Sequence, residues 1–188
     1  MKKRFQNLVE DDVMQLLAAG DITALEVLYQ LHYENIYRYA VRILGNATEA
    51  DDIAQNVFLK IWKYRKTYTP TKKFRAWALR ICANLCIDRM RKADYKDLAL
   101  INASNVMENR DNSLTDIAIY DEKLAIAAQV FHRLPYVEQQ LLALRFDGDL
   151  SIAEIAETLG CSVRTVHYRT SLAIQRLKKI SGDSNERN

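Results

Sequence analysis

Apolar residues recur every three or four positions along most of the chain, and the pattern breaks near the residues that most often end helices. The glycines are at 20, 45, 148, 160 and 182, and the prolines are at 70 and 135. No stretch alternates apolar and polar residues as a strand would. The pattern therefore predicts an all-α fold, with helices in the first half over about residues 8–18, 21–44, 46–64 and 73–92.

The helical pattern weakens between residues 94 and 113, where the sequence is polar and acidic overall. Such a segment buries too little apolar surface to pack, so we predict a flexible linker. Periodicity returns over about residues 114–134, and Pro135 is well placed for the first turn of the next helix. Further helices are expected over about residues 135–146, 151–159 and 163–180. The chain thus divides into two small helical domains, residues 1–93 and 114–188, joined by a linker over residues 94–113.

Helix-capping residues support two of these starts. Asp21 directly precedes a long apolar-periodic segment and can accept a hydrogen bond from its first free N–H groups. Asn46 is followed three residues later by Glu49, which resembles a capping box with Asn in place of Ser or Thr. Gly45 lies between the two segments, so the first helix should end there.

The segment SIAEIAETLGCSVRTVHYR, residues 151–169, has the pattern of a helix-turn-helix. Ala156 permits close helix approach, Gly160 can take the left-handed turn conformation, and Ser162 can cap the second helix. Val163 and Val166 should then face inward. The exposed start of the second helix carries residues that can reach base edges or phosphates: Arg164, Thr165, His167, Tyr168 and Arg169. An ordinary helical hairpin with a solvated basic face is the alternative.

Charge is distributed unevenly, although the net charge is only +3. Residues 60–93 hold eleven Lys and Arg against Asp88 alone, and residues 161–180 hold five basic residues and no acid. Residues 5–59 and 94–122 carry net charges of −7 and −5. The basic blocks are typical of polyanion-binding surfaces. With 49% apolar residues the chain can build a core, but two domains would each have a small one.

The first basic block also carries aromatic residues, as surfaces that bind unpaired bases do. Arg80 and Asn84 fall on one face of the predicted helix over residues 73–92, apart from its apolar stripe. Phe74 and Trp77 belong to that stripe, so core packing is the stronger interpretation for each of them taken singly.

Several classes of function are not supported by any motif. Cys82, Cys86 and Cys161 are an odd number of cysteines, which favours a reducing cytoplasm over a disulfide framework. Cys82 and Cys86 are one helical turn apart without a second ligand pair, so we expect buried thiols and no metal. We find no phosphate loop or nucleophile motif, and expect no enzyme, cofactor or small-molecule substrate. No apolar run is long enough for membrane insertion.

Three stretches, taken together, resemble the bacterial extracytoplasmic-function sigma factors of the sigma-70 family. ATEADDIAQNVFLKIWK, from residue 47, is similar to their polymerase-clamp helix. FRAWALRICANLCIDRMRK, from residue 74, is similar to the helix that follows it. Residues 134–179 are similar to their DNA-binding domain. The resemblance covers about residues 20–93 and 114–180, and implies a protein that directs core RNA polymerase to promoters and initiates transcription.

The resemblance also implies sites and partners. The surface for the clamp helices of polymerase would comprise Asp51, Asp52, Gln55, Phe58 and Lys60. The minus-ten element would meet Arg80, Asn84, Tyr64, Lys72, Lys73 and Phe74. The minus-thirty-five element would meet the five residues at the start of the second helix of the helix-turn-helix. The expected partners are core RNA polymerase, through its clamp helices and flap, promoter DNA, and an anti-sigma factor.

A different class of protein stays open at this point. A helix-turn-helix repressor or activator would use its N-terminal half to dimerise or to bind a ligand, and would bind its operator as a dimer. The basic block over residues 60–93 and the acidic linker argue against it. Tyr168 is bulky where relatives often have a small polar residue, so no base preference is carried over from the family.

Overall fold

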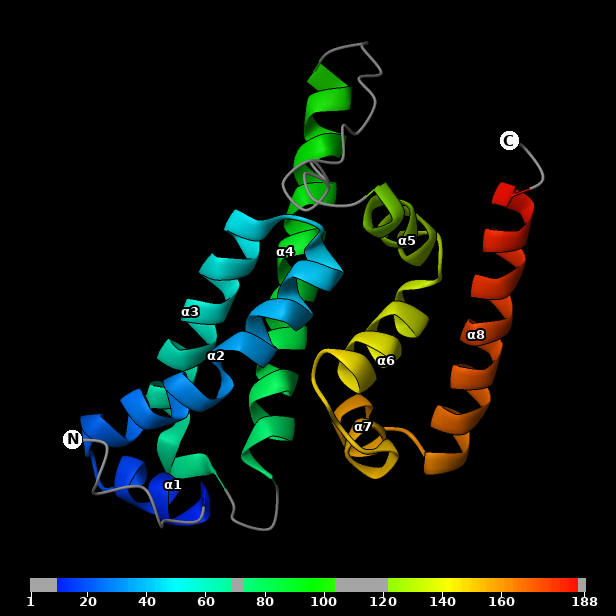
Figure 1. Ribbon diagram of the computed structural model, residues 1–188. Coiled ribbons are helices and arrows are strands. Elements are labelled where there is room, and N and C mark those ends of the chain that lie inside the picture. Colours follow the sequence, from blue (N-terminus) through cyan, green and yellow to red (C-terminus); the bar gives the residue numbers. More distant parts are fainter. Residues whose placement is uncertain (1–9, 69–72, 104–121, 186–188) are drawn as a thin grey trace.

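The computed structural model describes residues 10–68, 73–103 and 122–185 (Figure 1). The first half consists of α1 (Glu10–Ala18), α2 (Ile22–Leu44), α3 (Ala47–Tyr64) and α4 (Phe74–Ala103), with a short 3-10 turn at Arg65–Thr67. The second half consists of α5 (Glu122–His132), α6 (Tyr136–Phe146), α7 (Ile152–Leu159) and α8 (Val163–Asn185). Every regular element among these residues is a helix, which confirms the all-α prediction.

The caps predicted in the first half are present. The Asp21 carboxylate accepts a hydrogen bond of 2.9 Å from the Thr23 N–H at the start of α2. The Asn46 side-chain oxygen accepts one of 2.9 Å from the Glu49 N–H at the start of α3. Gly45 ends α2 with a φ of 68°, a left-handed conformation that other residues adopt only at a cost. These local signals fix where the two helices begin and end.

Helices α2, α3 and α4 pack around a shared apolar centre, and α1 packs against α2. The centre is built from residues recurring at helical spacing, as the sequence predicts. Its fully buried side chains include Leu28, Ile36, Tyr39, Ile61, Phe74 and Leu79. This three-helix arrangement positions the outer faces of α3 and α4.

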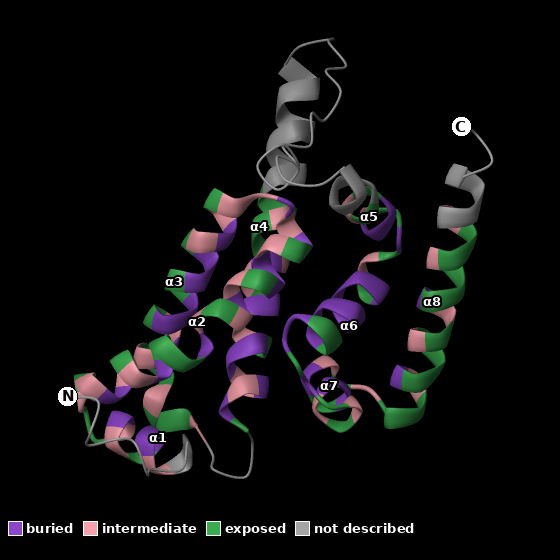
Figure 2. Cartoon of the chain, in the orientation of Figure 1, coloured by how far each residue is buried: buried purple, intermediate pink, exposed green. Residues whose placement is uncertain are grey.

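In the second half, α6 lies in the interior. Residues 138–144 are all buried, and Figure 2 shows the middle of the helix in the buried colour, with exposed residues at its ends. The buried apolar residues of both halves form one continuous cluster, because α6 packs against α2 and α7 packs against α4. The expectation of two separate small cores was therefore wrong. The reason is that the two halves share an apolar interface.

Two helices are longer than predicted. α4 continues past Lys92 to Ala103, so the first ten residues of the expected linker, 94–103, are helical. The segment ADYKDLALINA contains neither Gly nor Pro and has several strong helix formers, so nothing in it stops the helix. α8 continues past residue 180 to Asn185, with Gly182 inside it. Residues 104–121, which include the rest of the expected linker, lie outside the described residues.

Candidate DNA and polymerase interfaces

The turn between α7 and α8 has the capping pattern of a helix-turn-helix. Ser151 and Glu154 form a reciprocal capping box at the start of α7, with hydrogen bonds of 3.3 and 2.8 Å. Gly160 ends α7 in the left-handed conformation, with φ 64° and ψ 36°. The Ser162 hydroxyl then accepts a hydrogen bond of 3.1 Å from the Thr165 N–H and caps α8. The start of α8 is therefore fixed by a side-chain cap directly after the turn.

The first turns of α8 present a polar face to solvent. Val166 and Ala173 are fully buried, and Tyr168 exposes 67% of its surface. Arg164, His167 and Arg169 are also exposed, and Thr165 is half-buried. Val163 is 46% exposed, so its predicted inward orientation was wrong. The packing of α8 on its neighbours starts one turn further along, at Val166.

The exposed face of α4 carries Arg80 and Asn84, one helical turn apart. Tyr64, at the end of α3, is 42% exposed, and the Lys63 ammonium lies 5.6 Å from the centre of its ring. Lys73 is exposed, but its ammonium is paired at 3.1 Å with the Glu154 carboxylate. Lys72 lies outside the described residues. The structure thus brings Arg80 and Asn84 together and leaves them open to a ligand.

Phe74 does not belong to this surface. Its side chain is fully buried, with ring centres 4.8 Å from His32 and 6.0 Å from Trp77. The assignment of Phe74 to the minus-ten surface was therefore wrong for this conformation. Position 74 falls on the apolar stripe of α4, which faces α2, and that stripe decides the orientation of its ring.

The outer face of α3 carries Asp52 and Gln55, both exposed. Leu59 lies one turn further along and exposes 66% of its surface, although the sequence analysis did not single it out. Phe58 is 4% exposed and packs under the Tyr29 ring at 4.8 Å, so its assignment to this surface was wrong. Lys60 is half-buried. Positions 52, 55 and 59 follow the spacing of one helix face, so this spacing could have indicated Leu59 from the sequence.

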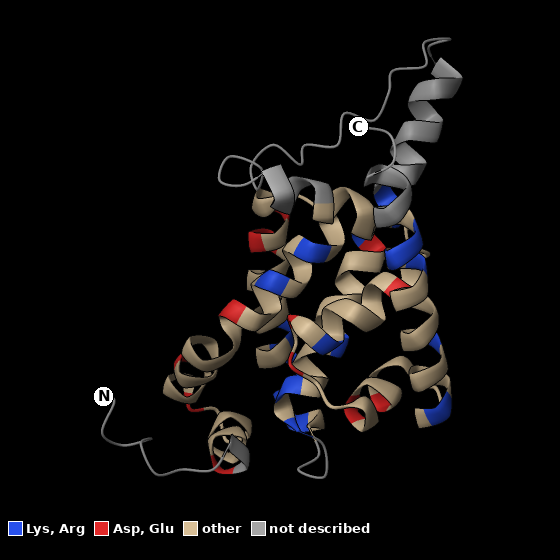
Figure 3. Ribbon diagram, turned by 45° about the vertical axis from the view of Figure 1, so that its right-hand side comes forward, with Lys and Arg blue, Asp and Glu red and all other residues tan. Residues whose placement is uncertain are grey.

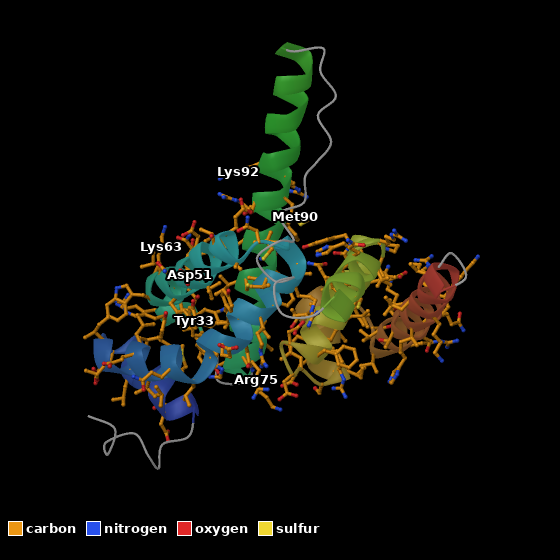
Figure 4. The ribbon with its side chains drawn as sticks, turned by 45° about the horizontal axis from the view of Figure 1, so that its top comes forward. Tyr33, Asp51, Lys63, Arg75, Met90 and Lys92 are labelled. Atoms are coloured by element: carbon orange, nitrogen blue, oxygen red, sulfur yellow. The ribbon has the colours of Figure 1, made fainter. Side chains whose placement is uncertain are left out.

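Asp51 is held between two side chains. The Tyr33 hydroxyl of α2 donates a hydrogen bond to one carboxylate oxygen, and the Gln55 amide donates one of 3.0 Å to the other. Figure 4 shows Tyr33 and Asp51 facing each other across the α2–α3 contact. Burial and the hydrogen bond to Asp51 raise the pKa of Tyr33 well above its ordinary value, so the phenol stays protonated and remains a donor.

Comparison with known protein families matches both halves of the chain. The family model for sigma-70 region 2 matches residues 28–95, and the model for sigma-70 region 4 matches residues 125–177. The ECF RNA polymerase sigma factor SigW of Bacillus subtilis is 30% identical over 168 residues, which cover 85% of this chain and 90% of SigW. This chain belongs to the extracytoplasmic-function sigma factors. SigL of Mycobacterium tuberculosis is 25% identical, over 86% of this chain and 90% of its own.

Two solved structures have the fold of this sigma factor. CnrH, in complex with the cytosolic domain of CnrY, has a TM-score of 0.67 at 23% identity, over 91% of this chain and 96% of CnrH. RpoE of Bartonella quintana, in complex with the anti-sigma factor NepR, has a TM-score of 0.67 at 18% identity, over 84% of this chain and 96% of RpoE. The two-part helical fold is therefore that of sigma factors.

The family membership decides between the two classes of protein left open by the sequence. A sigma factor is a regulatory, non-catalytic protein that binds core RNA polymerase and directs it to promoters. The reading as a helix-turn-helix repressor or activator is not favoured. In the described part of the chain, no helix has the length and apolar character needed to cross a membrane.

The cysteines of the sigma factor are thiols. Cys82 and Cys86 are fully buried, as predicted, and Cys161 is half-buried. Burial raises the pKa of Cys82 well above its ordinary value, which keeps the thiol protonated and unreactive. Among residues 10–68, 73–103 and 122–185, no three His, Cys, Asp or Glu are grouped to hold a metal ion.

No sequence pattern indicated the residues that join the two halves of the sigma factor. Basic side chains on α2 and next to the start of α4 pair with acidic side chains that follow α6. Figure 3 shows Lys and Arg spread over both halves with acidic residues among them. No sequence pattern connects residues 147–149, the sequence Asp-Gly-Asp, to residues more than seventy positions away.

Proposed function

We propose that the exposed start of α8 binds the minus-thirty-five promoter element, with Arg164, His167, Tyr168 and Arg169 as its main contacts. The observation that carries this proposal is the polar, basic face on a helix start that is capped by Ser162 and preceded by the turn at Gly160. A recognition helix needs such a start, because its first residues are the ones that reach base edges in the major groove.

The minus-ten element is assigned to Arg80 and Asn84 on α4, together with Tyr64, Lys72 and Lys73. The support is the exposure of Arg80, Asn84 and Tyr64 on neighbouring elements, near the loop between α3 and α4. An arginine can bind phosphate or guanine, and an asparagine can bind a base edge, so the pair fits DNA with accessible bases.

The polymerase clamp is assigned to the outer face of α3. The proposed surface keeps four residues expected from the sequence and adds the exposed Leu59. The four are Asp51, Asp52, Gln55 and Lys60. An exposed apolar side chain among oriented polar groups is typical of a protein–protein contact.

The clamp surface and the two DNA surfaces are each small, so each alone supplies few contacts. Binding of the protein to polymerase holds both DNA surfaces near the promoter and so raises their effective concentration there. We place this activity in the cytoplasm, with an anti-sigma factor as the regulator, since RpoE of Bartonella quintana was solved in complex with the anti-sigma factor NepR.

The test is a pull-down of bacterial core RNA polymerase with the purified protein, followed by run-off transcription from a pool of genomic promoters. Stable core binding with new start sites is the expected result, and the aligned starts would identify both elements. Absence of core binding, with tight binding of the protein alone to a palindromic site, would replace the proposal with a dimeric regulator.

Two variants separate the assigned surfaces in the same assay. Arg169→Ala should lower promoter-specific transcription roughly tenfold or more, as loss of a base or phosphate contact costs about 1–3 kcal/mol, and should keep core binding. Lys179→Ala, at the other end of α8, removes the same charge and serves as the control. The double variant Asp52→Ala with Gln55→Ala should weaken core binding and keep DNA binding. Equal loss of core and DNA binding by Arg169→Ala would refute its role.

A further inference from the structure

Tyr168 exposes a large aromatic side chain that is not packed against the rest of the fold. Its surface is 67% exposed, and it forms no hydrogen bond or ring contact with any residue that the structure describes. Tyr29 and Tyr64 are also exposed, but each of these rings has a neighbour. Tyr29 stacks on Tyr33, and the Lys63 ammonium lies over the ring of Tyr64. The stability of the fold therefore does not explain the aromatic residue at position 168.

Tyr168 lies on the face of α8 that points away from the rest of the protein. Successive residues of a helix are about 100° apart around its axis, so Tyr168 is about 200° from the buried Val166. Arg164 is two positions before Val166 and lies on the same outer face, one turn ahead of Tyr168. Both side chains are exposed. One guanidinium and one aromatic ring therefore occupy the centre of the face that the start of α8 offers to a ligand.

The aliphatic hydroxyl groups near Tyr168 are already bonded within the helix and its cap. The Thr165 hydroxyl lies 2.8 Å from the Ser162 hydroxyl. The hydroxyls of Thr170 and Ser171 donate to main-chain carbonyl oxygens one turn earlier, at 2.8 and 3.1 Å. These short side chains are therefore directed back to the helix, and the longer side chains of the outer face extend furthest from its axis.

A helix in the major groove presents its centre and its flanks to different parts of the DNA. The groove is about 12 Å wide, and a helix with its side chains is about 10–12 Å across. The centre of the outer face then meets the base edges, and the flanks meet the sugar-phosphate backbone. Arg169 is three positions after Val166, about 60° from the packed side, and belongs to a flank. Arg164 and Tyr168 are at the centre, so they face the bases.

The two central side chains differ in the base edges that they fit. A guanidinium pairs with the two acceptors of guanine, whereas an aromatic ring fits an apolar group, and the C5-methyl of thymine is the apolar group in the major-groove pattern. Contact between this methyl and the ring removes apolar surface of both from water. Arg164 and Tyr168 are about 6 Å apart along the helix axis, and base pairs are stacked at about 3.4 Å, so the two contacts fall within about two base pairs.

We propose that Tyr168 binds the C5-methyl of a thymine in the minus-thirty-five element, within about two base pairs of a guanine bound by Arg164. The contact rests on the proposed function of α8 and adds to it a base that this helix selects. The aromatic ring makes the contact, and the Tyr168 hydroxyl is not required for it.

The test is run-off transcription by core polymerase loaded with the protein, on a template library whose minus-thirty-five region is randomised. Sequencing of the transcribed templates should show thymine selected at one position by the wild type. Tyr168→Ala should lose that selection and keep the selection at the neighbouring positions, whereas Tyr168→Phe should keep both. The control is Ile174→Ala, which removes another exposed apolar side chain of α8 and should select the same bases as the wild type.

Removal of the methyl group alone gives the second measurement. Deoxyuridine in place of the selected thymine keeps every hydrogen-bonding group of the base and deletes only the methyl. The affinity of the wild-type holoenzyme for the promoter should fall about fourfold, the factor that corresponds to the burial of one apolar carbon. The holoenzyme with Tyr168→Ala should bind the two duplexes equally, because the ring that contacts the methyl is gone.

Three results would overturn the proposal: the same base selection by the wild type and Tyr168→Ala, an equal loss of selection with Tyr168→Phe, or wild-type binding that deoxyuridine does not weaken. The second of these would assign the contact to the hydroxyl. A protein that binds no core polymerase would refute the proposed function instead. The thymine contact is then measured on duplexes selected by the protein alone, where the same three results would overturn it.

Discussion

The Asp51 carboxylate shows how one residue of the proposed polymerase surface is oriented. Its two oxygens accept hydrogen bonds from Tyr33 and Gln55, which lie on different helices. The Tyr33 ring is itself stacked between Tyr29 and Tyr37, with ring centres at 4.8 and 5.9 Å. A carboxylate held in this way loses little side-chain entropy when it binds a partner.

We therefore predict that Tyr33→Phe weakens core polymerase binding about three- to tenfold, since it removes one hydrogen bond worth about 1 kcal/mol and keeps the ring. The measurement is a competition assay for core polymerase with fluorescently labelled protein. Tyr37→Phe is the matched control, because its hydroxyl is not bonded to Asp51. The same loss with both variants would show that the hydroxyl of Tyr33 has no specific role.

At the scale of single residues, the sequence predicted positions better than orientations. Arg80, Asn84, Asp52, Gln55 and the residues at the start of α8 are exposed as expected. Phe58 and Phe74 are buried, although family resemblance assigned both to binding surfaces. Resemblance to a family aligns positions along the chain. The direction of a side chain depends on which face of its helix is packed, and this is known only when the neighbouring helices are placed.

At the scale of elements, two glycines near α7 serve different physical purposes. Gly160 has a φ of 64° and open space around the position of a Cβ. Gly148 does not have a positive φ, but a Cβ there would lie 2.7 Å from Leu79 and 2.8 Å from the Leu144 carbonyl oxygen. The first glycine is needed for backbone conformation and the second for lack of a side chain.

Replacement of each glycine by alanine should distinguish these two purposes. Gly160→Ala should cost about 1 kcal/mol of unfolding free energy through backbone strain alone. Gly148→Ala should cost about 1–3 kcal/mol, because overpacking moves backbone or core side chains, and it should also disturb the contact between the two halves. Urea unfolding of both variants gives the comparison. A smaller cost for Gly148→Ala than for Gly160→Ala would contradict this account.

Helix starts were predicted more reliably than helix ends. Asp21, Asn46 and Ser162 accept the capping hydrogen bonds that their positions indicate. The ends of α4 and α8 were placed too early, since falling amphipathicity was taken as the end of a helix. Backbone hydrogen bonds continue a helix as long as no Gly, Pro or competing side chain stops it, and Gly182 alone does not stop α8.

At the scale of the whole molecule, the contact between the halves was the feature that the sequence did not predict. Arg42 and Asp147 are 105 positions apart, and Arg75 and Asp149 are 74 apart. Alternating acidic and basic blocks indicated separate partner surfaces, but charge along a chain does not determine which blocks meet. Helical periodicity likewise gives the apolar face of α6 without showing that α2 covers it.

The shared interior predicts a dependence of stability on pH. Burial of His132, at the end of α5, lowers its pKa below the ordinary 6.5; the charge of Arg42 adds to this, and a hydrogen bond with Gln139 partly opposes it. The unfolded chain then binds more protons than the folded one, so stability is full above about pH 6.5 and falls as the pH drops below it.

Thermal unfolding between pH 8 and pH 5 measures this effect. The melting temperature of the wild type should decrease over the lower half of the range, and His132→Gln should show a smaller decrease. Glu154 contributes at lower pH, since its pKa lies below the ordinary 4.5. A variant as sensitive as the wild type between pH 7 and pH 5 would exclude His132 as the source.

The continuous α4 has a mechanical consequence. Its 30 residues make a rod about 45 Å long, on which Arg75 and the Arg89 guanidinium, 2.7 Å from Glu49 of α3, are two points of attachment. The exposed Arg80 and Asn84, which we propose to contact the minus-ten element, lie between these points. A tilt of about 5° at one end moves the other by about 4 Å, because a helix transmits displacement along its axis. A displacement at either attachment, Glu49 on α3 or Asp149 after α6, would therefore shift Arg80 and Asn84 as well.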